Sequence, residues 1–263
     1  MILRRIGNKS KIASRIQQEF PPHRIYIEPF FGAGGMYFNK SKAKFNTLND
    51  LDGDVFNLFM CVIDRKQDLY DAFKIMPVHT DLLNYWKINK ETDPIKKALR
   101  FLFLSNFTYL GKMDSLNTKL RDLPKEQFYN KIDKTFEMLK NVSFRNWDFR
   151  KLLSSLSFVD IDFGNPSFER ESVFIYSDSP YLDTVDTYSD SETWKEQDCI
   201  DLFDCLQETK CKFGLSEFNH PFVINQAIER GLNIINIGER KNLKNVRTEI
   251  LITNYKNNQQ KLF

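Results

Sequence analysis

A short apolar run that ends in a glycine-rich turn constrains the fold of this chain most strongly. The run is RIYIEPF at residues 24–30, and GAGGMYFNKSKA at 32–43 has the composition of a turn that enters a helix. A second apolar run, FNTLND at 45–50, follows. Strand, glycine turn, helix and strand together form the unit of doubly wound nucleotide-binding sheets. The sequence therefore predicts an α/β fold.

The remaining segments divide the chain into two predicted domains. Helical periodicity dominates from about 55 to 150, as in Ile95, Ala98, Leu99, Leu102 and Phe103. Strand and helix patterns alternate again afterwards, and an amphipathic helix is expected at 9–20. We expect a mostly parallel, Rossmann-like sheet built from residues 1–55 and 151–263. Residues 56–150 form a mostly helical insertion in this prediction. Strands are expected at 173–177, 211–218, 232–238 and 248–255, and helices around 199–206 and at 221–231, the latter closed by Gly231.

Composition and charge narrow the class of protein. The chain has 263 residues, is 41% hydrophobic and carries a formal net charge of +3. Residues 151–236 hold six basic and sixteen acidic residues, whereas both ends and the segment 60–150 are basic. This asymmetry weakly favours a polyanionic partner. No apolar run approaches the roughly 20 residues of a membrane span, so we expect a cytoplasmic protein. The four Cys and three His form no metal-ligand pattern, and no metal is expected.

The glycine turn and the next strand predict a nucleoside site. Tyr37 stands where the dinucleotide fingerprint needs its third glycine, which disfavours a pyrophosphate cofactor. Asp50 follows Gly32 by eighteen residues, where a carboxylate can accept hydrogen bonds from ribose hydroxyls. This combination without phosphate-binding residues favours S-adenosylmethionine. If the glycines are considered alone, the alternative interpretation is an ordinary tight turn before a helix, with no ligand.

A second polar segment follows the apolar run VFIYS. It is Asp178-Ser179-Pro180-Tyr181, called the DSPY segment below. A carboxylate of Asp178 and the backbone carbonyl of Ser179 can accept both N–H groups of an exocyclic amine, turning its lone pair toward a methyl donor. Pro180 would stiffen the turn, and Tyr181 would stack on the base. A simple Asx-type turn is the alternative for this segment in isolation.

These motifs together resemble the Dam-like DNA adenine-N6 methyltransferases of bacteria and phages. The order matches over nearly the whole chain: RRIGNKSKI, IEPFFGAGG, LNDLDGDVFN, a helical target-recognition insertion, DSPY and a closing RTEILITNY. The family's usual Asp-Pro-Pro-Tyr has serine at its second position here. Because that residue acts through its carbonyl, we expect the segment to function with a looser turn.

The resemblance implies specific roles for residues of this chain. It implies double-stranded DNA as substrate and a flipped adenine as target, with a cognate restriction endonuclease as a candidate partner. The segment RFLFLSNFTYLGK, residues 100–112, is similar to the helix and loop that meet DNA in the family. Phe107 falls where an aromatic ring fills the gap left by the flipped base. The implied cofactor-binding residues are Arg5, Lys9, Glu28, Phe30, Gly32, Gly34, Asp50 and Asp178. The candidate DNA contacts are Phe107, Tyr109, Lys112, Lys119 and Arg121.

Other functions compatible with the same residues stay open. Methylation of cytosine N4, or of an amine in RNA, would use the same amine-orienting geometry. A non-catalytic DNA-binding protein with a degenerate methyltransferase fold would keep the architecture but lose turnover through Ser179. The intact Asp50, Asp178, Tyr181 and glycines favour the active adenine-N6 enzyme over that alternative.

Overall fold

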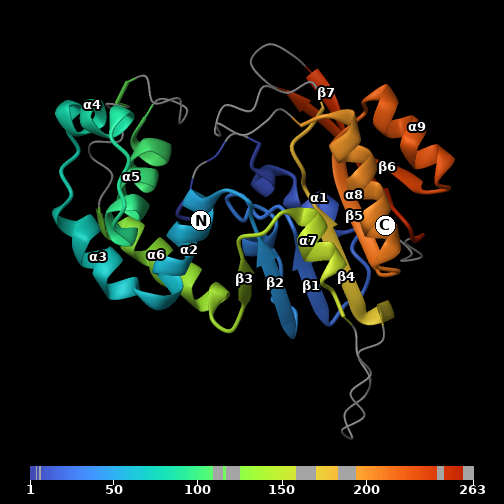
Figure 1. Cartoon of the computed structure of the whole chain (residues 1–263), viewed down its shortest axis with the longest axis horizontal. Coiled ribbons are helices and arrows are strands. Elements are labelled where there is room, and N and C mark those ends of the chain that lie inside the picture. Colours follow the sequence, from blue (N-terminus) through green and yellow to red (C-terminus); the bar gives the residue numbers. More distant parts are fainter. Residues whose placement is uncertain are drawn as a thin grey trace, which may run out of the picture. The chain divides into compact units, whose positions relative to one another are not determined.

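The computed structural model of the chain contains two compact units (Figure 1). The residues that it describes are 1–3, 5, 7–108, 115–116, 125–157, 170–182, 194–241 and 246–256. The first unit comprises residues 1–11, 32–40 and 50–146, and the second comprises residues 12–31, 41–49 and 147–263. Each unit is built from three segments that are separated in the sequence by segments of the other unit.

The first unit is mostly helical. Its core contains the predicted face of the helix α5 (Pro94–Phe107), because Ile95, Ala98, Leu99, Leu102 and Phe103 are all buried. Its elements are η1 (Lys9–Lys11), η2 (Tyr37–Asn39), α2 (Gly53–Asp64), α3 (Lys66–Ile75), α4 (Thr80–Ile88), α5 (Pro94–Phe107), α6 (Lys125–Leu139) and β3 (Ser143–Arg145). The hydrophobic spacing of the sequence thus predicts which face of this helix turns inward.

Acidic residues fix the starts of two helices of this unit. Asp52 precedes α2, and its side chain accepts a hydrogen bond from the Asp54 amide at 2.8 Å. Asp93 precedes α5 in the same way and accepts from the Lys96 amide at 2.9 Å, with Pro94 in the first turn. An aspartate before a helix satisfies amides that otherwise have no partner, so both boundaries are set locally.

The second unit contains most of a sheet and the helices that cover it. Its strands are β1 (Ile25–Glu28), β2 (Phe45–Asn49), β4 (Val173–Ser177), β5 (Lys212–Phe218), β6 (Asn233–Lys241) and β7 (Val246–Thr253), and its helices are α1 (Ala13–Gln17), α7 (Phe149–Ser154), η5 (Arg170–Ser172), α8 (Glu196–Glu208) and α9 (Pro221–Glu229). These strands lie in the sheet in the order β2-β1-β4-β5-β7-β6. The pairs β1–β2, β1–β4 and β4–β5 are parallel, whereas β5–β7 and β6–β7 are antiparallel. The fold is therefore a mixed α/β fold with a parallel centre, close to the prediction.

Both faces of the central strands are buried. On one face Ile175 and Phe213 belong to an apolar cluster with Leu202 and Phe203 of α8 and Val223 of α9. On the other face the rings of Phe20 and Phe174 lie 4.5 Å apart, centroid to centroid. Burial on both sides explains why β4 reads as a continuous apolar run rather than an alternating one.

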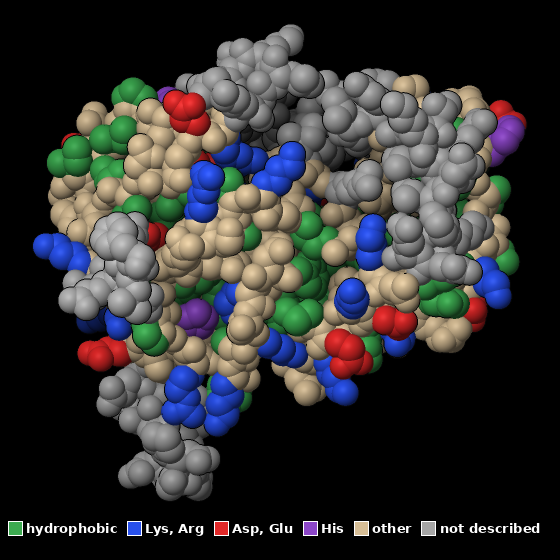
Figure 2. All heavy atoms as spheres, turned by 180° about the vertical axis from the view of Figure 1, so that it is seen from behind, with side chains coloured by type: hydrophobic (Ala, Val, Ile, Leu, Met, Phe, Trp, Pro, Cys, Tyr) green, Lys and Arg blue, Asp and Glu red, His purple; other side chains and the backbone are tan. Residues whose placement is uncertain are grey.

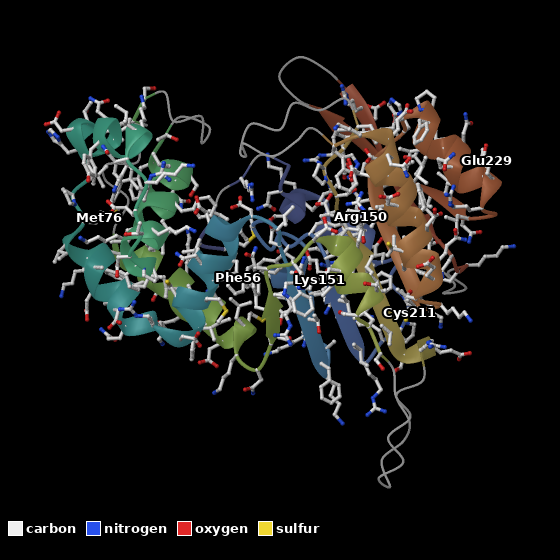
Figure 3. All side chains as sticks on the ribbon, in the orientation of Figure 1. Phe56, Met76, Arg150, Lys151, Cys211 and Glu229 are labelled. Atoms are coloured by element: carbon white, nitrogen blue, oxygen red, sulfur yellow. The ribbon has the colours of Figure 1, made fainter. Side chains whose placement is uncertain are left out.

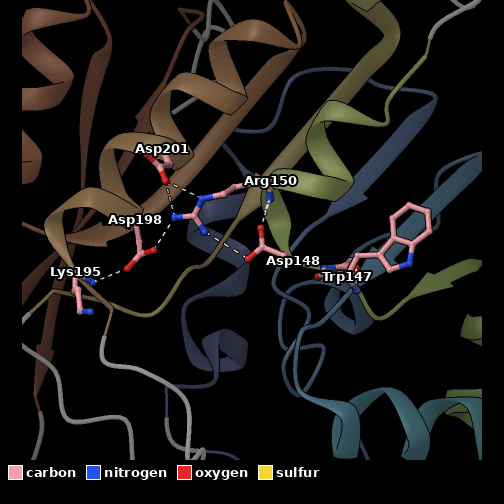
Figure 4. A network of polar contacts seen from close by, with 7 residues as sticks. Trp147, Asp148, Arg150, Lys195, Asp198 and Asp201 are labelled. Carbon is pink, nitrogen blue, oxygen red and sulfur yellow. Dashed lines mark hydrogen bonds and ion pairs between the residues drawn. The ribbon is translucent and has the colours of Figure 1, made fainter.

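Arg150 joins α7 to α8 within the second unit, and Figure 3 labels it beside Lys151 on α7. Its guanidinium donates to Asp201 at 2.7 Å and to Asp198 at 2.6 Å, and lies 3.4 Å from Asp148 (Figure 4). Asp198 also accepts from the backbone amide of Lys195 at 2.9 Å, at the start of α8. One cation thus holds the first turns of two helices together.

Three local predictions differ from the structure. The helix expected at 9–20 is reduced to η1 and the five residues of α1, although Ile16 and Phe20 are buried as expected. The segment 32–43 forms only the 3₁₀ turn η2, because the backbone is extended again at Lys40. The helical segment 56–150 contains a strand, β3, and α7 begins before it ends. The division into a catalytic domain and an inserted recognition domain stays a prediction.

Gly231 ends α9 as predicted, with a positive φ of 65° just beyond the last helical turn. Glycine adopts this conformation without steric cost, which is why it commonly follows a helix. Among the helices that the structure describes, none is long and apolar enough to cross a membrane.

Candidate active site

The carboxyl ends of β1, β2 and β4 lie at one edge of the sheet, because these three strands are parallel neighbours. Gly32 follows β1 by four residues. Asp50 follows β2 directly, and Asp178 follows β4 directly. Residues beyond the carboxyl ends of parallel strands are where open α/β sheets bind their ligands. Each predicted polar motif thus begins at the edge of the sheet that favours ligand binding.

Asp50 and the glycine turn form one hydrogen-bonded element of the first unit. The Gly32 amide donates to Oδ2 of Asp50 at 2.6 Å, and the Asp52 amide donates to Oδ1 at 2.9 Å. Gly32 and Gly34 have positive φ angles of 54° and 71°. Each carboxylate oxygen has a second lone pair, so the group can accept ligand hydroxyls in addition to the two amides.

Burial disfavours the charged form of the Asp50 carboxyl and raises its pKa to about 6. The charge of Arg5 and the two amide hydrogen bonds oppose that rise. The side chain of Arg5 itself pairs with Asp52 at 2.8 Å. Arg5, a predicted cofactor residue, is therefore linked to Asp50 through Asp52: it pairs with the Asp52 side chain, and the Asp52 amide donates to Asp50.

The glycine turn also depends on the N-terminal segment of the same unit. A side-chain carbon at Gly35 would lie 2.9 Å from the backbone nitrogen of Lys9 and even closer to Asn8. Lys9 is only 3% exposed, although its residue type favours solvent. Glycine at position 35 therefore permits a close approach of the residues around Lys9, which the sequence motif alone did not explain.

Glu28 and Phe30 belong to the second unit. Glu28 is 2% exposed and accepts a hydrogen bond from the Tyr26 hydroxyl at 2.8 Å. The ring of Phe30 lies 5.4 Å from that of Phe149 and 5.8 Å from that of Trp194, centroid to centroid. Trp194 was not among the predicted site residues, since it follows an acidic stretch without periodicity. An aromatic group at Phe30 suits a flat, apolar ligand surface.

The DSPY segment is held tightly at its last residue. The Tyr181 hydroxyl lies 3.1 Å from Oδ1 of Asp178 and 2.6 Å from Oε1 of Glu249. Its ring meets that of Phe218 edge-on, with centroids 4.6 Å apart. Ser179 is buried as well. Sequence reasoning missed Glu249, whose only signal is an acid directly before the apolar residues of an expected strand.

The Tyr181 hydroxyl stays protonated at neutral pH. Burial raises its pKa well above the ordinary value for tyrosine, and the charges of Asp178 and Glu249 raise it further. The group is therefore a donor of a single hydrogen to two carboxylates.

The candidate DNA contacts fall mostly outside the described residues, which include neither Tyr109, Lys112, Lys119 nor Arg121. Phe107 ends α5 and is buried, with its ring 5.6 Å from that of Phe103. Thr108, the next residue, forms an antiparallel bridge with Leu116. Lys and Arg side chains are scattered over the face drawn in Figure 2. No cluster of three potential metal ligands occurs among the residues that the structure describes.

A parallel sheet with polar residues after three adjacent strands is the architecture of α/β proteins that bind nucleotides or nucleosides. A family model narrows that class. The model of the D12 class N6 adenine-specific DNA methyltransferases matches residues 6–260, and the chain belongs to this family. The resemblance inferred from the motif order is thereby confirmed.

Curated relatives agree with this assignment. DNA adenine methylase of Salmonella typhi is 27% identical over 111 residues, which cover 40% of each chain. DNA adenine methylase of Haemophilus influenzae is 30% identical over 113 residues, 40% of this chain and 39% of that protein. Modification methylase StsI of Streptococcus sanguinis is 24% identical over 285 residues, 95% of this chain and 42% of that protein. The matches thus span about two fifths of the length of these relatives.

Proposed function

We propose that this protein transfers a methyl group from S-adenosylmethionine to the N6 amine of adenine in double-stranded DNA. The observation that carries the proposal is the position of the DSPY segment directly after β4, in a chain of the adenine-specific D12 family. The names of its relatives, DNA adenine methylase and modification methylase, support the same activity.

Asp178 and Ser179 orient the amine in this proposal. The N6 lone pair of adenine is delocalised into the ring, which makes the amine a weak nucleophile. Hydrogen bonds from its two N–H groups to the Asp178 carboxylate and the Ser179 carbonyl hold the lone pair out of the ring plane. Bound S-adenosylmethionine would supply the methyl group to this nitrogen and leave as a neutral thioether, and the proton that the amine releases would pass to water. Such catalysis rests on positioning and electrostatics without a covalent enzyme intermediate.

The residues around Asp50 fit the nucleoside part of the cofactor. The Asp50 carboxylate has free lone pairs for ribose hydroxyls, and the left-handed glycines allow the backbone to approach a ligand. Bound S-adenosylmethionine supplies an electrophilic methyl group on a sulfonium. We assign Arg5, Lys9, Glu28 and Phe30 to the same ligand, and Gly32 and Gly34 to the turn that contacts it.

DNA binding is assigned to residues 56–150. Phe107, Tyr109, Lys112, Lys119 and Arg121 remain the proposed contacts. Because Phe107 is packed against Phe103, its entry into a DNA duplex would require the end of α5 to rearrange. A restriction endonuclease of the same specificity is proposed as a partner, by analogy with the modification methylase.

Methyl transfer from tritiated S-adenosylmethionine to unmethylated genomic DNA tests the proposal. Digestion to nucleosides and mass spectrometry should detect N6-methyladenine with the wild-type protein and none above background with Asp178→Ala. N4-methylcytosine, or transfer to RNA instead of DNA, would support the rival amino-methyltransferases. Absence of product while the protein still binds cofactor and DNA would support the non-catalytic binding protein.

A further inference from the structure

Glu249 is a buried carboxylate in the middle of β7, with an exposed fraction of 0%. A buried charge is costly unless it is paired and hydrogen-bonded. Its Oε1 accepts the Tyr181 hydroxyl at 2.6 Å, and its Oε2 lies 3.4 Å from the guanidinium of Arg240 on β6. Glu249 thus connects the segment after β4 to two strands at the other end of the second unit's sheet.

The bond between Tyr181 and Glu249 reaches across one strand. In the sheet order β4-β5-β7, the strand β5 separates the start of the DSPY segment from β7. Phe218 of β5 lies opposite Glu249 in the β5–β7 register and packs edge-on against the Tyr181 ring. The guanidinium of Arg247 covers Phe218 at 5.2 Å. Both the ring and the hydroxyl of Tyr181 are therefore fixed by residues of β5 and β7.

The hydroxyl of Tyr181 can direct its one hydrogen to only one carboxylate at full strength. The distance to Glu249 is 2.6 Å and the distance to Asp178 is 3.1 Å, so the hydrogen points to Glu249. Asp178, at the longer distance, is the weaker of the two acceptors. Removal of Glu249 would turn the same hydrogen toward Asp178.

We propose that Glu249 is a positioning residue for the DSPY segment: by accepting the Tyr181 hydroxyl it fixes the end of the segment, and with it the direction in which Asp178 presents its carboxylate to the substrate amine. This inference rests on the proposed function, because it assumes that Asp178 orients that amine. Arg240 compensates the charge of Glu249 from the neighbouring strand. The closing RTEILITNY motif thereby acquires a role in the site.

A double-mutant cycle tests the inference. Glu249→Ala, Tyr181→Phe and the double variant are compared in single-turnover methyl transfer with cofactor and DNA saturating. We expect Glu249→Ala to slow transfer by about tenfold, the size of one hydrogen bond, with little change in KM for either substrate. When Tyr181 is already Phe, adding Glu249→Ala should leave the rate of methyl transfer almost unchanged. Effects that multiply in the double variant would overturn the inference.

Two further variants separate positioning from loss of structure. Glu249→Gln keeps an oxygen that accepts from Tyr181, so its rate should lie within about threefold of wild type. Glu249→Met, which has a similar volume but no carboxylate, replaces Ala in the cycle if Glu249→Ala does not fold. Glu217→Gln is the matched control, because Glu217 is also a buried glutamate of the same sheet and accepts a hydrogen bond from the Phe218 amide. A rate loss in Glu217→Gln as large as in Glu249→Ala would contradict a specific role. Full activity of Asp178→Ala would refute the proposed function itself, whereas an inactive Asp178→Ala with independent effects at 181 and 249 would refute only this inference.

Discussion

The amide of Gly32 and the carboxylate of Asp50 are joined by a 2.6 Å hydrogen bond, eighteen residues apart in the sequence. The turn after β1 and the acid after β2 are therefore one structural element. A substitution at either residue alters both the shape of the turn and the acceptor offered to a ribose. This coupling determines how variants of Asp50 should be designed.

Asp50→Ala should weaken S-adenosylmethionine binding by at least tenfold. It removes the proposed acceptor for the ribose and leaves the Gly32 and Asp52 amides without their partner. Isothermal titration calorimetry measures the affinity. The S-adenosylmethionine affinity of Asp50→Asn, which keeps one acceptor oxygen, should lie between those of Asp50→Ala and wild type. Unchanged affinity in Asp50→Ala would remove Asp50 from the cofactor site.

Cofactor affinity should fall as the pH decreases through about 6. The pKa of Asp50 is raised to about 6 by burial, so the carboxyl gains a proton below that pH and loses an acceptor. The decline should approach tenfold per pH unit and be absent in Asp50→Asn. The raised pKa of Asp50 also affects stability, because the folded protein holds this proton more tightly than the unfolded chain does. The contribution of Asp50 to the free energy of unfolding is therefore greatest below its ordinary pKa near 4 and is lost as the pH rises through about 6. A flat affinity profile between pH 5 and 7 would contradict the assignment.

Asp178→Ala should abolish methyl transfer and leave DNA affinity within about threefold of wild type. The carboxylate is proposed to orient the amine rather than to bind the phosphate backbone, which dominates affinity for DNA. Electrophoretic mobility shift and tritium transfer measure the two properties on the same preparation. A parallel loss of DNA binding would indicate a structural role for Asp178 instead.

Ser179→Pro should preserve or raise the rate of transfer. The substitution restores the proline usual in the family, keeps the backbone carbonyl and reduces the freedom of the turn. Ser179 is buried, so Ser179→Ala serves as the control for loss of the hydroxyl alone. An inactive Ser179→Pro protein with normal thermal stability would show that the serine N–H or hydroxyl has its own function.

Arg150→Met should reduce the free energy of unfolding by about 1 kcal/mol, as expected for a partly exposed ion network. Arg150 is more than a third exposed and bonds Asp198 and Asp201 of α8. Urea denaturation measures the change, and Arg150→Lys should recover part of it because one cation remains. Methyl transfer should be unaffected, since the network lies outside the proposed site. An unchanged midpoint would mean that the network adds no net stability.

The sequence predicted the parallel centre of the sheet from the strand, glycine turn and strand at residues 24–50 and from the alternation of strand and helix patterns after residue 173. It overestimated helix in 32–43, where left-handed glycines and the extended Lys40 leave only a 3₁₀ turn. Asp50 was identified because a spacing of eighteen residues has a known physical meaning. Glu249 was missed because both faces of β7 contain buried residues, so alternation does not distinguish its face from any other.

The position of β7 has a consequence for how the protein acquires activity as it is synthesised. β7 is translated after every other strand described, yet it lies between β5 and β6 in the sheet. A nascent chain on the ribosome can complete the DSPY segment and pair β4 with β5 long before Glu249 is available to Tyr181. On the proposed role of Glu249, the full rate of methyl transfer is reached only after β7 has been synthesised and has paired with β5.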